Sequence, residues 1–209
     1  MALDTYTNLK TTIANYLNRS DLTAYLGDFI TLTEARLNRE LRVREMVNTD
    51  TTTTTVAGTQ GYALPTGYVE ATTVIFQSNP YCTLRFINNS DFYNKYNASQ
   101  SRGKPTYFTI VGTNILLGVA PDSATTLQIN YYKKIDALTD SNTTNTILTN
   151  YPELYLYGSL AESAPFIMQD ERINTWAALY KEALKNANET SSRGSTTTSP
   201  LQMSTPQVA

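Results

Sequence analysis

The spacing of apolar residues predicts a helix near the start of the chain. Leu9, Ile13, Tyr16 and Leu17 recur at i, i+4, i+7 and i+8, so a helix would carry all four on one face. Asp4 precedes this stripe and has the short acidic side chain that caps helix N-termini. The polar stretch after Leu17 interrupts the pattern, and we expect the helix to end there.

A second helix is predicted from Ser20 or Asp21, either of which can cap it, to about Arg44. Its inner stripe is apolar and consists of Leu22, Leu26, Phe29, Ile30, Thr33, Leu37 and Leu41. The second half alternates in charge, so Arg36–Glu40 and Glu40–Arg44 form i,i+4 pairs that each stabilise a helix by a few tenths of a kcal/mol.

From Asn48 the pattern changes to short β-branched and aromatic runs separated by Gly and Pro, which predicts strands. The runs are 69–76, 83–87, 107–111, 114–117 and 126–134. Thr51 to Thr55 is an unbroken threonine run that favours strand or extended chain. Gly112-Thr113 and Pro121-Asp122 are typical of tight hairpin turns. A short helix capped by Ser90 is expected within this region.

Helical patterns return after a Thr- and Asn-rich linker at 140–150. Pro152 fits the first position of a helix over 151–164, which is apolar on nearly every side and should end at Pro165. A last helix, capped by Asp170, carries an apolar stripe of Ile173, Trp176, Ala177, Tyr180, Ala183, Leu184 and Ala187.

Beyond Thr190 the chain is rich in Ser, Thr, Gln and Pro and has no periodicity, which predicts an extended tail. Its only apolar anchors are Leu201, Met203 and Val208. The predicted fold class is therefore α+β. A helical bundle is formed by residues 1–47 and 141–189, a β-rich subdomain with one short helix is inserted at 48–140, and the extended C-terminal tail spans 190–209.

Composition narrows the function classes. The chain of 209 residues has no histidine and one cysteine, Cys82. This excludes Ser-His-Asp and Cys-His nucleophile pairs, imidazole or thiolate metal sites and an internal disulfide. Gly103-Lys104-Pro105 lacks the preceding glycine and the Ser/Thr of a phosphate-binding loop. We therefore predict no enzyme activity, no metal and no cofactor.

The net charge of the chain limits the classes of partner that it can bind. The net charge of −2 gives no counterion-release drive onto DNA and no attraction to an anionic membrane. Residues 1–10 contain Asp4 and no apolar core of a secretory signal, so we expect synthesis in the cytoplasm.

Two features stand out from an ordinary core. The 15 tyrosines, with Tyr151, Tyr155 and Tyr157 around one helix, suit a protein interface because tyrosine joins a large apolar area to a polar tip. An ordinary core with hydroxyls at its rim is the alternative. The second feature is the charged segment of Arg36, Arg39, Glu40, Arg42 and Arg44. It is either a solvated, ion-paired face or an inter-subunit salt-bridge surface; the interleaved glutamates disfavour nucleic-acid binding.

The order of several sequence blocks resembles bacteriophage head–tail adaptor proteins, the connector or tail-tube-collar subunits of short-tailed phages and relatives. The blocks are YLNRSDL at 16–22, Phe29-Ile30, EARLNRELR at 34–42, Leu64-Pro65, GYVE at 67–70, Gly103-Lys104-Pro105 with Tyr107, Gly118 with Pro121, Tyr131-Tyr132, YPELYLYGSLAESA at 151–164, and Asp170-Glu171-Arg172 with Trp176. The resemblance covers residues 3 to 187.

This resemblance implies a subunit of a ring of about twelve copies at the head–tail junction of a virion. The ring would lie below the portal, continue the DNA channel and provide a platform for tail attachment, so that DNA is ejected through its lumen without specific binding. Implied partners are further copies of the chain, the portal protein and a downstream tail or nozzle protein, with the C-terminal tail docking on one of them. A tail-fibre or receptor-binding module is the alternative.

Overall fold

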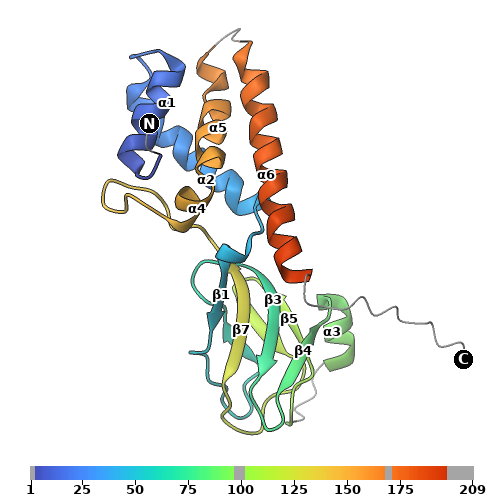
Figure 1. The fold of residues 1–209 in the computed structure, drawn as a ribbon. Helices are drawn as coiled ribbons and strands as arrows, with labels where there is room; N and C mark the ends of the chain where they lie inside the picture. Colours follow the sequence, from blue (N-terminus) through green and yellow to red (C-terminus); the bar gives the residue numbers. More distant parts are fainter. Residues whose placement is uncertain (1–2, 97–101, 168–170, 197–209) are drawn as a thin grey trace, which may run out of the picture. The chain divides into compact units, whose positions relative to one another are not determined.

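The computed structural model describes residues 3–96, 102–167 and 171–196 (Figure 1). It is a mixed α+β structure, as predicted, and it divides into two compact units. The helical unit contains the described residues up to Glu45 and from Ile135 onward, and the β unit is Met46–Lys134. Residues 135–140, which we assigned to the insertion, lie in the helical unit, where the Ile135 amide donates to Asn38 Oδ1 at 2.8 Å.

The helical unit is organised around one central helix. Its helices are α1 (Tyr6–Leu17), α2 (Leu26–Glu40), α4 (Thr146–Asn150), α5 (Pro152–Glu162) and α6 (Arg172–Thr196), with 3-10 turns at Thr23–Tyr25 and Ala164–Phe166. Helix α5 packs against α1, α2, α4 and α6, which explains why its sequence is apolar on nearly every side (Figure 1). Their arrangement as a helical bundle stays a prediction.

The N-terminal helices begin and end at different residues than predicted. Thr5, not Asp4, caps α1, because Thr5 Oγ1 accepts from the Asn8 amide at 3.3 Å while Asp4 accepts from the Asn8 side chain. Helix α2 starts after a 3-10 turn and stops at Glu40, with Leu41 in extended conformation. The prediction of a helix to Arg44 is therefore wrong.

The early end of α2 has a packing cause. Leu41 and Val43 are both completely buried, and two residues separated by one position share a side in extended chain but not in a helix. The Arg42 guanidinium donates to the Asn38 and Leu41 carbonyls, at 3.2 and 2.7 Å, and so satisfies carbonyls at the helix end.

The last two long helices follow the sequence signals in part. Pro152 is in the first turn of α5, as predicted. Helix α6 runs to Thr196, so the prediction of extended chain from Thr190 is wrong for residues 190–196. Glu189 pairs with Lys185 and Arg193 at i±4, and such pairs support a polar helix end. Asp170 and the tail residues Leu201, Met203 and Val208 lie outside the described residues.

The β unit is a curled sheet of seven strands. The strands are β1 (Val47–Asp50), β2 (Gly61–Ala63), β3 (Tyr68–Phe76), β4 (Cys82–Phe86), β5 (Tyr107–Val111), β6 (Asn114–Leu117) and β7 (Leu127–Lys133), in the order β1-β7-β3-β4-β5-β6-β2. All neighbours are antiparallel except β4 and β5, whose parallel pairing is made possible by the crossover helix α3 (Asn89–Tyr96).

Only one of the two predicted hairpin turns joins paired strands. Gly112, with φ 60°, connects β5 to β6, and Val111 pairs with Asn114. Pro121-Asp122 is not a hairpin turn, because β6 pairs with β5 and β2 whereas β7 pairs with β1 and β3. The threonine run is extended chain beside the start of β7, where Thr54 forms an isolated bridge with Thr126.

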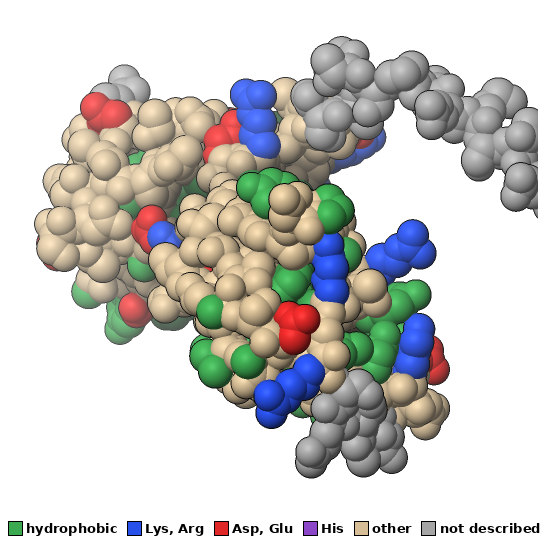
Figure 2. All heavy atoms as spheres, turned by 90° about the horizontal axis from the view of Figure 1, so that it is seen from below, with side chains coloured by type: hydrophobic (Ala, Val, Ile, Leu, Met, Phe, Trp, Pro, Cys, Tyr) green, Lys and Arg blue, Asp and Glu red, His purple; other side chains and the backbone are tan. Residues whose placement is uncertain are grey.

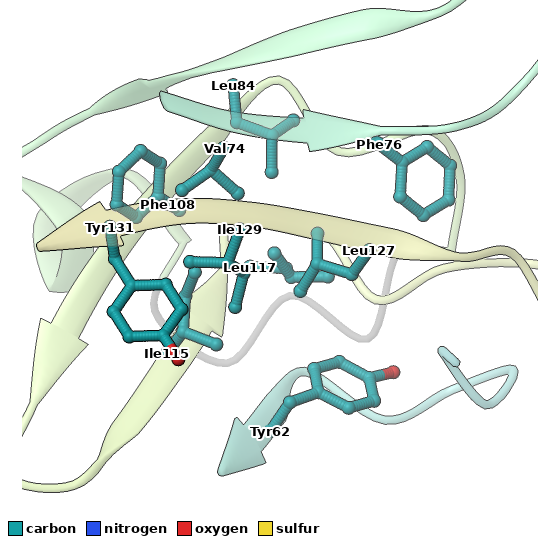
Figure 3. Close-up of a cluster of buried hydrophobic side chains, with 10 residues drawn as sticks. All are labelled: Tyr62, Val74, Phe76, Leu84, Phe108, Ile115, Leu117, Leu127, Ile129 and Tyr131. Carbon is teal, nitrogen blue, oxygen red and sulfur yellow. The ribbon is translucent and has the colours of Figure 1, made fainter. Parts of the chain in front are cut away.

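The β unit has its own hydrophobic core, drawn in Figure 3. Leu127, Ile129 and Tyr131 of β7 are at most 3% exposed, which confirms the alternation in the sequence. The other labelled members are Tyr62, Val74, Phe76, Leu84, Phe108, Ile115 and Leu117, from the remaining strands except β1. The side chains on the inner face of the curled sheet therefore pack against one another and form this core.

Candidate interaction surfaces

The described part of the chain offers no metal site. Its acidic and sulfur-containing side chains form no group of three or more that could bind an ion. Among the helices described, none is both long and apolar enough to cross a membrane. The Cys82 thiol lies 3.6 Å from the Pro105 carbonyl and packs against the start of β5.

Arg36 is held inside the helical unit by two carboxylates. Its Nε lies 3.3 Å from Glu40 Oε1, and its Nη1 lies 3.2 Å from Glu162 Oε1 of α5. Its guanidinium also stacks 4.4 Å from the ring centroid of Tyr180 in α6. Arg36 and Glu40 thus form the predicted i,i+4 pair, and together with Glu162 and Tyr180 they tie α2, α5 and α6 to one another.

Tyr180 completes this group, and the Arg36 guanidinium lies over its ring. Its ring is completely buried, and its hydroxyl donates to Glu40 Oε2 at 3.2 Å. Burial, and secondly the negative charge of Glu40, raise the pKa of the Tyr180 hydroxyl, so the phenol stays protonated and acts as a donor. These contacts make Arg36 and Glu40 part of the unit's internal structure.

The remaining arginines of this segment differ in their surroundings. Arg42 donates to backbone carbonyls at the end of α2. Arg44 pairs with the adjacent Glu45, with Nε 3.2 Å from Oε1, instead of with Glu40 as predicted, because the helix has already ended. Arg39 is exposed on α2, and within the described chain its side chain makes no hydrogen bond or ion pair.

The three tyrosines predicted at an interface also differ in how deeply they are buried. Tyr155 is completely buried: its hydroxyl accepts from Asn145 Nδ2 at 2.7 Å and donates to Glu34 Oε1 at 3.1 Å. It is a core residue, so we remove it from the interface prediction. Tyr151 and Tyr157 are half-buried, and the Tyr151 hydroxyl donates to Glu45 Oε2 at 3.4 Å.

Glu34 is the buried acid of the helical unit. It is 6% exposed, and its Oε1 accepts from the Leu138 amide at 2.8 Å as well as from Tyr155. Burial raises the pKa of the Glu34 carboxyl, and the two hydrogen bonds oppose this rise. Glu34 therefore fastens the segment that leaves the β unit onto α2. In the sequence, Glu34 stands out only as an acid beside the apolar stripe of this helix.

Large exposed hydrophobic residues form a set that sequence reasoning missed. In the helical unit they are Tyr16, Tyr25, Leu32 and Phe166, and in the β unit Val47, Val56, Tyr81, Phe86 and Tyr93. Figure 2 shows hydrophobic side chains at the surface next to Lys and Arg side chains. Leu32 was detectable in the sequence, because it lies off the inner stripe of α2. Single exposed hydrophobic residues are common on protein surfaces, whereas adjacent ones, such as Tyr25 and Phe166 with ring centroids 5.3 Å apart, are typical of protein-binding surfaces.

A comparison with protein families identifies the chain. Residues 4–204 match the model of the SU10 adaptor protein family. The chain belongs to this family. The protein is thus a phage head–tail adaptor, which confirms the resemblance drawn from the sequence blocks, and it is a virion structural protein. No curated protein matches the chain.

Basic side chains of the adaptor contact carboxylates, aromatic rings and backbone carbonyls. All the ion pairs described above lie in its helical unit, on or next to α2, α5 and α6. In the β unit, Lys95 Nζ lies 4.0 Å from the Tyr107 ring centroid, and Lys104 Nζ donates to the Pro80 carbonyl at 2.6 Å.

Proposed function

We propose that the adaptor is a structural subunit of a ring below the portal of a tailed phage. The ring of about twelve copies would continue the DNA channel and provide a platform for the tail or nozzle protein. The family match over residues 4–204, nearly the whole chain, carries this proposal. It gives no support to the alternative of a tail-fibre module.

The exposed members of the predicted interface are the best candidates for contacts between neighbouring subunits. Arg39 and Arg44 are exposed, and Tyr151 and Tyr157 are half-buried. Arg36, Glu40 and Arg42 are occupied by contacts within the chain and position α2 and the segment after it. An intersubunit contact through Arg44 would compete with its single exposed ion pair to Glu45, a pair that contributes little to stability.

Charge is compatible with passage of DNA. The chain carries 16 Lys and Arg against 18 Asp and Glu, and a wall that captured many phosphates would slow the strand. The basic side chains that we describe are used in ion pairs, ring contacts or carbonyl contacts in most cases. The lumen of the proposed ring would therefore contact DNA weakly and without sequence preference.

Portal binding is the direct test. The purified adaptor should remain small alone and should form a ring-sized complex when mixed with the cognate portal protein at micromolar concentration, as measured by light scattering with size-exclusion chromatography. The proposal predicts a stoichiometric complex. Absence of a complex at these concentrations would contradict it.

The same assay tests the C-terminal segment, which we propose docks on the portal or on a neighbouring subunit. Replacing Leu201, Met203 and Val208 together with serine should weaken portal binding, because these are the apolar residues available to bury. Circular dichroism should stay unchanged. A matched variant with Ser204 and Thr205 replaced by alanine should bind normally; equal binding by both variants would remove the segment from the mechanism.

A further inference from the structure

An exposed stripe runs from the end of the 3-10 turn at Thr23–Tyr25 along α2, on the side opposite the buried residues of this helix. Tyr25, Asp28, Leu32, Ala35 and Arg39 follow one another at intervals of three and four residues, the spacing of helices that pack along their length. All five residues are exposed, Leu32 by 51% and Tyr25 by 45%. We call these five residues the outer stripe. It has an aromatic and apolar body, an acid near its N-terminal end and a base at its C-terminal end.

The two charges of the outer stripe have no partner within the described chain. Neither the Asp28 carboxylate nor the Arg39 guanidinium makes a side-chain hydrogen bond or an ion pair, unlike Arg36 and Glu40 on the same helix. Asp28 and Arg39 are about 16 Å apart along the helix axis, at 1.5 Å per residue, so they cannot pair with each other. The charges are available to an external partner.

We propose that the outer stripe binds the outer stripe of a second copy of the chain in antiparallel orientation. A two-fold axis midway between Asp28 and Arg39 places each Asp28 opposite Arg39 of the second copy. The same register places Leu32 opposite Ala35, so a large side chain meets a small one, as helix packing requires. A parallel pair would bring Asp28 against Asp28 and Arg39 against Arg39, and like charges disfavour it.

The surrounding contacts support a small, reversible dimer. The Phe166 ring lies 5.3 Å from the Tyr25 ring and is 45% exposed, so it widens the apolar area at one end of the stripe. The contact still involves one helix of 15 residues per copy, well below the roughly 1,200–2,000 Å² of a stable interface. We therefore expect a dissociation constant in the micromolar range or weaker.

The dimer goes beyond the proposed ring. A two-fold contact is closed and does not generate a ring of cyclic symmetry, so the free dimer must open before subunits join the ring. Pairing of the outer stripes covers Leu32 and Tyr25 in the free protein and delays assembly until a stronger partner competes for them. The pairing can be tested with the full chain alone, independently of the portal.

Charge reversal provides a sharp test by sedimentation velocity over about a hundredfold range of concentration. The wild-type chain should show a monomer–dimer equilibrium. Asp28→Lys makes both ends of the stripe basic, and Arg39→Glu makes both ends acidic, so each variant alone should dimerise at least about tenfold more weakly. An equimolar mixture of the two variants should recover dimer formation, because unlike charges then meet at both ends.

The control is Lys181→Glu, an equal change of charge at an exposed position of α6, which should leave the wild-type equilibrium unchanged. Circular dichroism checks that every variant is folded. A wild-type chain that is monomeric at every concentration would overturn the proposal. So would a mixture that fails to recover dimers, because the two variants together restore unlike charges at both ends of the antiparallel pair. Either result leaves portal binding to be judged by its own assay.

Discussion

Replacing Gly158 with alanine should force α2 and α5 apart. A Cβ atom at Gly158 would lie 2.5 Å from Thr33 Cγ2 in α2 and 3.3 Å from Tyr180 Cδ2 in α6. Carbon atoms in favourable contact are about 3.5–4.0 Å apart, so α2 would have to move by about 1 Å. Thr33 cannot easily rotate away, because it is completely buried and its hydroxyl donates to the Phe29 carbonyl at 2.8 Å.

The expected loss follows from two opposing effects. Overpacking a close-packed core costs about 1–3 kcal/mol, and the contact with a held side chain favours the upper end of this range. Alanine in place of glycine stabilises a helix interior by about 1 kcal/mol. We expect Gly158→Ala to lower the free energy of unfolding by about 2 kcal/mol. With a urea dependence of about 2 kcal/mol per molar, the midpoint should fall by about 1 M.

Urea unfolding followed by tryptophan fluorescence measures this change in the helical unit. Trp176 is the single tryptophan of the chain, and it is 5% exposed on α6. The control is Gly27→Ala, where the added Cβ would meet only the end of the Tyr6 side chain, 3.0 Å away, and the midpoint should change little.

A second substitution identifies the contact responsible. Thr33→Ser removes the methyl group that a Cβ at Gly158 would meet and keeps the hydroxyl that bonds to the Phe29 carbonyl. In the Thr33→Ser background, Gly158→Ala should therefore cost little or even stabilise. The reasoning is refuted if Gly158→Ala alone raises the midpoint, or if the two changes destabilise additively.

Two further predictions concern other parts of the chain. The pKa of the Glu34 carboxyl is raised in the folded state, so the native chain binds a proton more readily than the unfolded chain. The contribution of Glu34 to the free energy of unfolding therefore rises as the pH falls from the folded-state pKa to the ordinary value of 4.5. Glu34→Gln keeps an acceptor for the Leu138 amide but removes the titrating carboxyl, so the variant should lose this pH dependence. As the pH is lowered, the urea midpoint of the wild type should rise relative to that of the variant. If the two midpoints change with pH in parallel, this prediction is wrong. Tyr62→Phe removes a hydroxyl that accepts from the Val56 amide at 3.1 Å, and should lower the stability of the β unit by about 1–2 kcal/mol in calorimetry. An unchanged transition would show that water replaces the hydroxyl.

Local sequence patterns identified which helices and strands form, but they were less accurate about the residues at which these elements begin and end. The apolar periodicity around Leu9 and Ile13 located α1, and the alternation of Leu127, Ile129 and Tyr131 located β7 and its inner face. The sequence predicted an end of α2 at Arg44 instead of Glu40, because charged residues at helical spacing continue to Arg44. Burial of Leu41 together with Val43 decides against the helix, and burial depends on residues far away in the sequence.

The candidate surfaces were harder to predict than the fold. The order of the sequence blocks resembled that of phage head–tail adaptors, and the family match confirms this resemblance. The sequence did not show which tyrosines of α5 are buried and which can reach a partner. Tyr155 and Tyr157 are two positions apart, yet only the tertiary packing shows that Tyr155 contacts Glu34 and Asn145 in the core. The outer stripe of α2 was present in the sequence, but its exposure was not.

The sequence by itself determined the classes of element, the absence of histidine and disulfide chemistry and the order of blocks typical of an adaptor, because these depend on residue type and short-range spacing. Only the tertiary structure decided which charges are satisfied internally. Arg36 meets Glu162 across 126 positions of sequence, whereas Arg39, three residues further along the same helix, makes no ion pair with a carboxylate of the described chain. Such pairings depend on how helices pack, and local spacing does not contain that information.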